Sequence, residues 1–278
     1  MKLLRGDGPL IRVGHRGAAA LAPENTLRSF EAALACGVDA IEFDVLDLAA
    51  GPLVLAHSND LAEVSHGAAA GRLEDRSLDE LREVAPELLT LDEGLAFLAG
   101  HEVGLHVDLK LTTRLDEVAD ALAEHRLSGR SVVSSFHLAS LAAFAVRAPQ
   151  TPIAFTYPED RYGVSRRRAL QPAIRLGTLA LRRALVTRIP AMIERAGVAA
   201  LMLHHAVVSA AAVQRAHAAG TAVWAWTVDD PAELARLEAA GVDAVISNDP
   251  RLFAQETGSV EADPVSREDR EFFSPEKL

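Results

Sequence analysis

Cysteine is almost absent from this chain of 278 residues, in which Cys36 is the single example. One cysteine excludes an internal disulfide. Long apolar runs are also missing, since no segment approaches the ~20 apolar residues that a membrane-spanning helix requires. The opening residues, MKLLRGDGPLIRV, contain no apolar stretch of the length found in secretory signals. These absences predict a cytoplasmic protein without a membrane span.

Positive charge is scarce too, because 28 basic residues stand against 39 acidic ones and leave a net charge of −11. Nucleic acids are bound through basic surfaces that match their phosphates, so we expect no nucleic-acid partner. Lysine occurs only three times, and Lys2 and Lys277 lie at the ends of the chain. The third, Lys110, therefore invites a specific role, since an ammonium is a compact charge whereas a guanidinium is planar.

The chain does contain a regular alternation of short apolar segments and amphipathic ones. Eight segments have the composition of β-strands, and apolar residues at helical spacing follow most of them. Strands that alternate with helices predict a parallel sheet. Eight such units between residues 10 and 255 predict a single-domain TIM (β/α)8 barrel in preference to an open sheet. The expected strands are 11–14, 40–45, 104–109, 131–135, 152–156, 200–204, 222–227 and 244–247.

Three segments depart from this rhythm. After the second strand, PLVLAH at 52–57 predicts an extra strand, and the polar residues 58–90 predict a short insertion that forms a loop or lid. A second departure is the long connection 157–189. Residues 256–278 are acidic and lack periodicity, so we expect a C-terminal tail that is mobile or lies on the surface.

Acidic residues gather at the predicted C-terminal ends of two strands, where TIM barrels carry their active sites. Glu42 and Asp44 are two residues apart and share a face, and so do Asp108 and Lys110. The two strands are consecutive and are expected to lie ~4.8 Å apart, so the carboxylates of Glu42, Asp44 and Asp108 should converge. A divalent cation, Ca²⁺ or Mg²⁺, would remove their mutual repulsion. The alternative is a structural cluster in which arginines pair with Glu42 and Asp44.

A series of short motifs runs through the chain in a fixed order. In that order and spacing, the chain resembles the glycerophosphodiester phosphodiesterase family over residues 11–253. The resemblance implies a TIM barrel and a metal-dependent phosphodiesterase. The family often has glutamate where this chain has Asp108, so we expect that ligand to be weaker or bridged by water. The matching motifs are His15-Arg16-Gly17, Pro23-Glu24-Asn25-Thr26, Glu42 with Asp44, His57, Asp108-Leu109-Lys110, Ser134-Ser135-Phe136, Trp226-Thr227-Val228 and Ser247-Asn248-Asp249-Pro250.

The motifs suggest a role for each remaining candidate. His15 and His57 would be the acid–base pair, because imidazole titrates near neutrality. Arg16 and Lys110 would hold the phosphodiester and its developing charge. Trp226 would supply an apolar wall for the glycerol or the alcohol. The alternatives are structural hydrogen bonds for the histidines, salt bridges for the two cations and core packing for the tryptophan.

Smaller features also lead to expectations. Asn25 or Thr26 should cap the first helix, and Glu24 either shapes this loop or supports the metal. His106 is expected to be a buried polar residue one layer below Asp108. The arginine-rich segment 161–188 is either a solvated basic face or a patch for anionic surfaces and hence a peripheral membrane contact.

The sequence therefore predicts an enzyme of lipid and glycerol metabolism that hydrolyses glycerophosphodiesters to sn-glycerol 3-phosphate and an alcohol. The attacking group is either water or the glycerol 2-hydroxyl, which would form a cyclic phosphate. A lysophospholipase D-type activity on lysolipids and a non-catalytic barrel that binds a phosphorylated ligand are the alternatives. The sequence does not reveal the oligomeric state.

Overall fold

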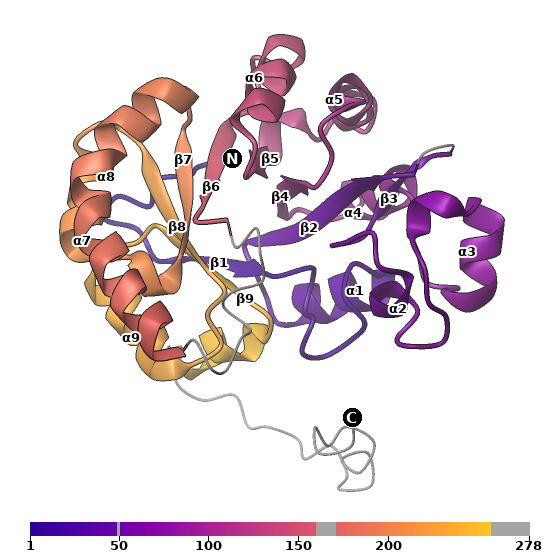
Figure 1. Ribbon diagram of the computed structural model, residues 1–278, viewed down its shortest axis with the longest axis horizontal. Helices are drawn as coiled ribbons and strands as arrows, with labels where there is room; N and C mark the ends of the chain where they lie inside the picture. The colour runs from indigo at the N-terminus through magenta and orange to yellow at the C-terminus, as the bar shows by residue number, and fades with distance from the viewer. Residues whose placement is uncertain (49–50, 160–170, 257–278) are drawn as a thin grey trace, which may run out of the picture.

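The computed structural model describes residues 1–48, 51–159 and 171–256, and in them eight parallel strands form a closed barrel (Figure 1). β1 pairs with both β2 and β9, which closes the barrel. The TIM-barrel prediction is thus confirmed, and each predicted strand is present with ends shifted by at most a few residues. The barrel strands are β1 (Ile11–Gly14), β2 (Ala40–Asp47), β4 (Gly104–Leu109), β5 (Ser131–Ser135), β6 (Ile153–Tyr157), β7 (Ala200–His204), β8 (Ala222–Trp226) and β9 (Ala244–Ser247).

Helices surround the barrel and connect its strands, as Figure 1 shows. The Thr26 side chain caps the first of them by accepting a hydrogen bond from the Ser29 backbone N–H, so Thr26 and not Asn25 is the cap. Asp230 caps α9 in the same way, with Pro231 at its first position. The helices are α1 (Leu27–Ala35), α4 (Leu91–Ala99), α5 (Leu115–Glu124), α6 (Leu138–Arg147), α7 (Gln171–Ala196), α8 (Ala210–His217) and α9 (Pro231–Ala239).

The core has two parts that follow from the alternation of side chains along each strand. On β2, Ile41, Phe43 and Val45 pack outward in the apolar shell between strands and helices. Ala40 packs inside the barrel with Trp224, whose indole N–H donates to the backbone carbonyl of Leu3. The lower barrel is therefore filled, and Trp224 belongs to the core. Inward positions higher on the same strands are left for polar side chains.

The insertion after β2 begins with the predicted extra strand, β3 (Leu53–Leu55), which runs antiparallel to β2. Residues 58–90 contain two short helices, α2 (Leu61–Val64) and α3 (Leu78–Val84), and a 3₁₀ turn. The segment therefore has more secondary structure than the expected loop. It has a small apolar cluster of its own, formed with β2 and β3 by Leu46, Leu48, Val54, Ala56, Leu61, Leu73, Leu81, Ala85 and Leu88.

The long connection before β7 contains helix α7, which the sequence analysis did not place. Leu185 and Ile189 anchor it in the apolar shell, whereas Leu176 is exposed. Part of the arginine-rich segment, 161–170, and nearly all of the acidic tail lie outside the described residues. None of the described helices is both long and apolar enough to cross a membrane.

Candidate active site

A single pocket at the C-terminal mouth of the barrel contains all eight side chains that the sequence analysis selected. This mouth pocket has an open space of about 500 Å³. It receives side chains from β2, β4, β6, β7, β8 and β9 and from the loops after β1, β3, β4, β5 and β8. It is lined by His15, Arg16, Glu42, Asp44, His57, His106, Asp108, Lys110, Phe136, Thr156, Met202, Trp226, Thr227 and Ile246.

Three carboxylates meet on one side of the mouth pocket. Asp44 of β2 is in register with Asp108 of β4, and Glu42 lies two residues before Asp44 on the same face. One oxygen from each of the three lies within 4.8 Å of the others, and the residues are only 1–5% exposed. The register of adjacent parallel strands thus brings together the carboxylates as the spacing in the sequence predicts.

Two cations compensate part of this negative charge. The Lys110 Nζ lies 3.0 Å from Asp44 Oδ1 and 2.5 Å from Asp108 Oδ2. The Arg16 Nε lies 3.2 Å from Asp44 Oδ2, and its Nη1 donates to Glu24 Oε2 at 2.7 Å. Burial opposes the charge of Lys110, but Asp108 and Asp44 outweigh burial and raise its pKa above the ordinary value. Glu24 therefore orients Arg16 and does not itself join the three carboxylates.

Glu42 is the carboxylate without an ion pair of this kind, and its Oε2 accepts a hydrogen bond from the Arg16 backbone N–H at 2.7 Å. Within the described chain it forms no ion pair with a lysine or an arginine, and the nearest imidazole nitrogen, His15 Nε2, is 3.8 Å away. Burial together with the charges of Asp44 and Asp108 raises the pKa of Glu42 well above its usual range. Asp44 behaves oppositely, because Lys110 and Arg16 outweigh burial and lower its pKa. A buried all-oxygen cluster in which one carboxylate has no ion pair with a lysine or an arginine fits a hard divalent cation.

Neighbouring polar side chains fix the orientation of the carboxylates. The Asn25 side-chain amide donates to Asp44 Oδ2 at 3.0 Å and accepts from the Asp44 backbone N–H at 3.1 Å. The Ser134 hydroxyl donates to Asp108 Oδ1. The sequence analysis placed Asn25 and Ser134 within motifs but gave neither this role, because their partners are distant in sequence.

His106 supports the same network from below. Its Nε2 lies 2.8 Å from the Ser134 hydroxyl, and its ring meets Trp224 edge-on. Burial lowers the pKa of His106 to about 4, so the imidazole is neutral near pH 7. The expected buried polar role agrees with this environment.

The tautomer of His15, which follows β1, is determined by two residues from the C-terminal part of the chain. The Asn248 amide donates its Nδ2–H to Asp229 Oδ2 at 2.7 Å, so its oxygen faces His15 Nδ1 at 2.6 Å. An oxygen acceptor at this position requires the proton on Nδ1 and leaves a lone pair on Nε2. Burial and the neighbouring Arg16 lower the pKa of His15 to about 4. The ring is therefore neutral, with its free nitrogen on the side of Glu42.

His57 lies at the edge of the pocket, just after β3. Its Nδ1 is 3.4 Å from Glu63 Oε1 on α2, and the Ser58 hydroxyl donates to the other oxygen of Glu63. The hydrogen bond from His57 is the main reason that the pKa of Glu63 falls to about 2. His57 thus has a carboxylate partner where His15 has an amide, and the two histidines have different electrostatic surroundings.

Trp226 and Phe136 form the apolar wall of the mouth pocket. Their rings meet edge-on with centroids 5.9 Å apart, and the Trp226 indole donates to the Met202 carbonyl at 3.0 Å. The Phe136 ring also lies 5.7 Å from Lys110 Nζ. Phe136 appeared in the sequence analysis only as part of a motif, because nothing in its spacing showed that it would face Trp226.

The turn after β1 places Arg16 by means of an unusual backbone. Arg16 and Gly17 both have positive φ, at 51° and 86°. The Ser29 hydroxyl of α1 donates to the Arg16 carbonyl at 2.6 Å and accepts from the Ala18 N–H at 2.8 Å. A Cβ on Gly17 would lie 2.3 Å from that hydroxyl oxygen. Glycine is therefore required for this turn to pack against α1.

Comparison with known proteins gives relatives that match along most of the chain. A glycerophosphodiester phosphodiesterase from Caldanaerobacter subterraneus is 24% identical over 257 residues, which cover 86% of this chain and 93% of the relative. A probable glycerophosphodiester phosphodiesterase 1 from Mycobacterium tuberculosis is 29% identical over 238 residues, with 78% and 81% covered.

Solved structures show the same barrel. A putative glycerophosphoryl diester phosphodiesterase from Silicibacter pomeroyi has a TM-score of 0.73 at 24% identity, with 92% of this chain and 96% of that chain covered. A phosphodiesterase from Oleispira antarctica, solved with the product sn-glycerol-3-phosphate, has a TM-score of 0.69 at 23% identity, with 90% and 97% covered. The model of one family matches residues 15–252. This chain belongs to the glycerophosphoryl diester phosphodiesterase family.

Proposed function

We propose that the protein hydrolyses glycerophosphodiesters to sn-glycerol 3-phosphate and an alcohol. The observation that carries this proposal is the convergence of three carboxylates, two cations and two histidines in one pocket beside an apolar wall. These are the groups needed to hold a phosphodiester, stabilise its charge and move protons. Family membership and the sn-glycerol-3-phosphate bound to the Oleispira antarctica protein support the same choice.

Glu42, Asp44 and Asp108 would hold one divalent cation, Ca²⁺ or Mg²⁺. When bound, such a cation supplies Lewis-acid polarisation of a phosphoryl oxygen. It also corrects the charge of the pocket: when all three carboxylates are ionised, they exceed Arg16 and Lys110 by one negative charge, which repels an anionic diester. Arg16 and Lys110 border the same space, so their remaining N–H groups can bind the phosphate oxygens.

We assign the proton transfers from the two environments of the histidines. His15 is neutral with a free Nε2, so it serves as the base that takes the proton from the attacking hydroxyl. His57 has Glu63 beside it, and this carboxylate stabilises the positive charge of an imidazolium. His57 therefore serves as the acid that gives a proton to the departing alkoxide. This scheme accommodates either water or the glycerol 2-hydroxyl as the attacking group.

Trp226 and Phe136 would pack against the carbon atoms of the glycerol, because they are the aromatic residues that line the mouth pocket. The carboxylates lie on β2 and β4 and the two cations just after β1 and β4, whereas Trp226 ends β8. A glycerol phosphate with its phosphate at the carboxylates and its carbons at the tryptophan would satisfy both parts of the pocket.

The deciding experiment measures the release of sn-glycerol 3-phosphate from glycerophosphocholine. Activity should disappear with a chelator and return with Ca²⁺ or Mg²⁺, and titrating each ion separately identifies the preferred one. A lysolipid tested in parallel distinguishes a lysophospholipase D-type activity. Binding of the diester without release of any product would instead support the non-catalytic barrel. A cytoplasmic location and a role in lipid and glycerol metabolism remain predictions from the sequence.

A further inference from the structure

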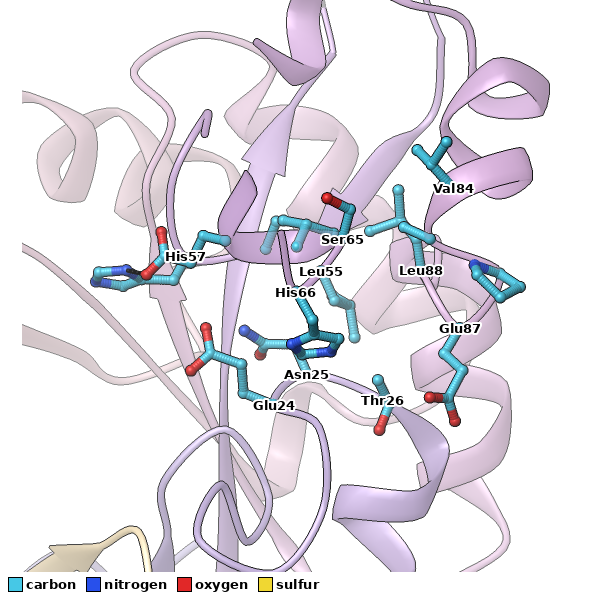
Figure 2. A pocket seen from close by; sticks show the side chains of 15 residues that line it. Glu24, Asn25, Thr26, Leu55, His57, Ser65, His66, Val84, Glu87 and Leu88 are labelled. Atoms are coloured by element: carbon cyan, nitrogen blue, oxygen red, sulfur yellow. Dashed lines mark hydrogen bonds and ion pairs between the residues drawn. The ribbon is translucent and has the colours of Figure 1, made fainter. Parts of the chain in front are cut away.

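Histidines that the proposed reaction does not use also lie near the mouth of the barrel. His66 of the insertion lines a pocket beside Glu24, as Figure 2 shows. His204 ends β7, and its ring meets that of Trp226, with centroids 5.2 Å apart. This contact places His204 next to the apolar wall of the mouth pocket.

The register of two adjacent strands brings His204 and Trp226 together. They are partners in the parallel pairing of β7 with β8, so their side chains point to the same face of the sheet. Two residues earlier on each strand, Met202 and Trp224 pack inside the barrel. His204 and Trp226 therefore face inward one layer higher, and their rings meet edge-on at 83°.

The ring of His204 is itself fixed by its surroundings. Its Nδ1 accepts a hydrogen bond from the Ala206 N–H at 3.2 Å, so the proton of the neutral ring is on Nε2. Burial lowers the pKa of His204 to about 4, and the ring is therefore neutral near pH 7. The His205 ring lies against it, with centroids 4.4 Å apart and the planes inclined by 32°.

His205 connects this pair of rings to helix α9. Its Nδ1 lies 2.7 Å from Glu233 Oε1, and Arg236 Nε donates to the other oxygen of Glu233 at 2.8 Å. Arg236 Nη2 also donates to the His205 carbonyl at 2.8 Å. A continuous series of contacts thus leads from α9 through His205 and His204 to Trp226.

Trp226 needs such support because little else holds its ring. Its indole N–H donates to the Met202 carbonyl, which fixes one edge. Among the described residues, Phe136 and His204 are the aromatic rings in contact with it. An indole free to move would have to be ordered when a ligand binds, and this ordering costs binding free energy.

We propose that His204 is a positioning residue, which holds Trp226 in the orientation that forms the apolar wall and thereby lowers KM. His204 does not line the mouth pocket, so it acts through Trp226 and not on the ligand directly. This inference rests on the proposed function, which assigns the glycerol carbons to Trp226, and it adds a residue that determines how well they bind.

Two substitutions separate the ring of His204 from its hydrogen bond. His204→Asn removes the ring and keeps an oxygen acceptor for the Ala206 N–H, whereas His204→Phe keeps a ring and loses the acceptor. We expect His204→Asn to raise KM for glycerophosphocholine about two- to tenfold, the factor that corresponds to one edge-to-face ring contact, and to leave kcat within about twofold. His204→Phe should keep KM near the wild-type value. The opposite pattern would mean that His204 only caps the turn after β7.

A double substitution tests whether the effect passes through Trp226. Trp226→Ala should raise KM, and His204→Asn should add no further rise in that background, because residues in contact are not additive. An equal rise with and without the tryptophan would overturn the proposal. The matched control is His101→Ala, which removes an imidazole from a contact with Phe97 at 4.7 Å before the start of β4, at the opposite end of the barrel. KM should not change in this control.

A measurement without substrate tests the positioning itself. The chain has two tryptophans, so ¹⁵N relaxation follows two indole N–H signals, and the signal missing from Trp226→Ala identifies Trp226. The heteronuclear NOE of Trp226 should fall in His204→Asn and keep its wild-type value in His204→Phe. The fully buried Trp224 is the internal reference and should stay rigid in both. If His204→Asn does not fold, His204→Ala replaces it.

The outcomes separate this inference from the proposed function. An indole as rigid in His204→Asn as in the wild type would overturn the positioning role, whatever the kinetics. A mobile indole with an unchanged KM would overturn its link to substrate binding. No release of glycerol 3-phosphate by the wild type would overturn the proposed function and with it the effect on KM, whereas the NOE would still decide whether His204 holds Trp226.

Discussion

The orientation of His15 depends on Asn248, a residue 233 positions away in sequence. Because Asp229 fixes the amide, Asn248 determines which nitrogen of His15 carries the proton. We expect Asn248→Ala to lower kcat by about 10- to 100-fold, the range seen when a residue that orients a functional histidine is lost. KM should change much less, because Asn248 does not line the mouth pocket. Steady-state kinetics on glycerophosphocholine make this measurement.

The conservative variant Asn248→Asp gives a sharper test of the same role. It keeps an oxygen acceptor for His15 Nδ1 but places a negative charge beside the ring, and this raises the pKa of His15 from about 4. A base with a higher pKa is protonated up to a higher pH, so the acidic limb of the pH–rate profile should move upward. An unshifted acidic limb would show that His15 is not the base.

Lys110 is the second residue whose identity matters beyond its charge. Its Nζ is held between Asp44 and Asp108 at 3.0 and 2.5 Å, in a space that suits a compact ammonium. Lys110→Arg should lower kcat/KM by at least about tenfold, because a planar guanidinium displaces the carboxylates from their positions. The free energy of unfolding should change much less, since the charge pairing is kept. Near-normal turnover in this variant would mean that any cation is sufficient here.

At the scale of elements, the turn between β1 and α1 both positions Arg16 and contributes to the stability of the fold. Gly17→Ala adds a Cβ 2.3 Å from Ser29 Oγ at a φ of 86°. Gly37 also has a positive φ, 70°, but a Cβ there would meet nothing within 4 Å. Gly37→Ala should cost about 1–2 kcal/mol from backbone strain alone. Gly17→Ala should cost about 1–3 kcal/mol more because of the clash.

Chemical denaturation of the two alanine variants measures this difference directly. Gly37→Ala acts as the control for backbone strain, since it adds the same methyl group at a similar φ. Equal free energies of unfolding would show that the turn moves away from α1 without cost. In that case the close packing between Gly17 and Ser29 would not be what positions Arg16.

The strands were predictable because alternation along a strand is a local signal. On β2, apolar residues point outward and Glu42 and Asp44 point inward. An error of a few residues in the predicted end of a strand therefore does not change which side chains face the inside of the barrel. The helices of the insertion were not predictable in the same way. Leu61, Leu73 and Leu81 come from separate short turns and meet only when the chain folds against β3. The spacing across these three segments follows no single helical period, although in and just after α3 Leu78, Leu81 and Ala85 lie three and four residues apart.

In the site, too, the features with a local sequence pattern were predictable and those formed by distant residues were not. The three carboxylates were predictable because they share the inward face of β2 and β4, and the register of these neighbouring strands places them side by side. The partners Asn25, Ser134, Glu63 and Asn248 were not, because side-chain hydrogen bonds across long separations leave no pattern in sequence. Polar residues that orient a site are therefore recognisable only once the barrel has brought them together.

At the scale of the whole molecule, the three carboxylates join β2 to β4 within the closed barrel, so a bound cation should stabilise the entire fold. At about 100 times Kd the gain is about 2.7 kcal/mol. For a chain of this size the gain corresponds to a rise in Tm of roughly 5–10 °C. Differential scanning calorimetry with and without Ca²⁺ or Mg²⁺ measures the shift.

The pH dependence of the metal-induced rise in Tm tests whether Glu42 binds the cation. Because the pKa of Glu42 is raised, the cation must displace a proton from it, so binding should weaken as pH falls and the shift should be larger at pH 8 than at pH 5.5. Glu42→Gln should abolish the shift. Without metal at pH 8 this variant should unfold no earlier than the wild type, since it removes a buried charge that Asp44 and Asp108 repel. A full metal-induced shift in Glu42→Gln would exclude Glu42 as a ligand.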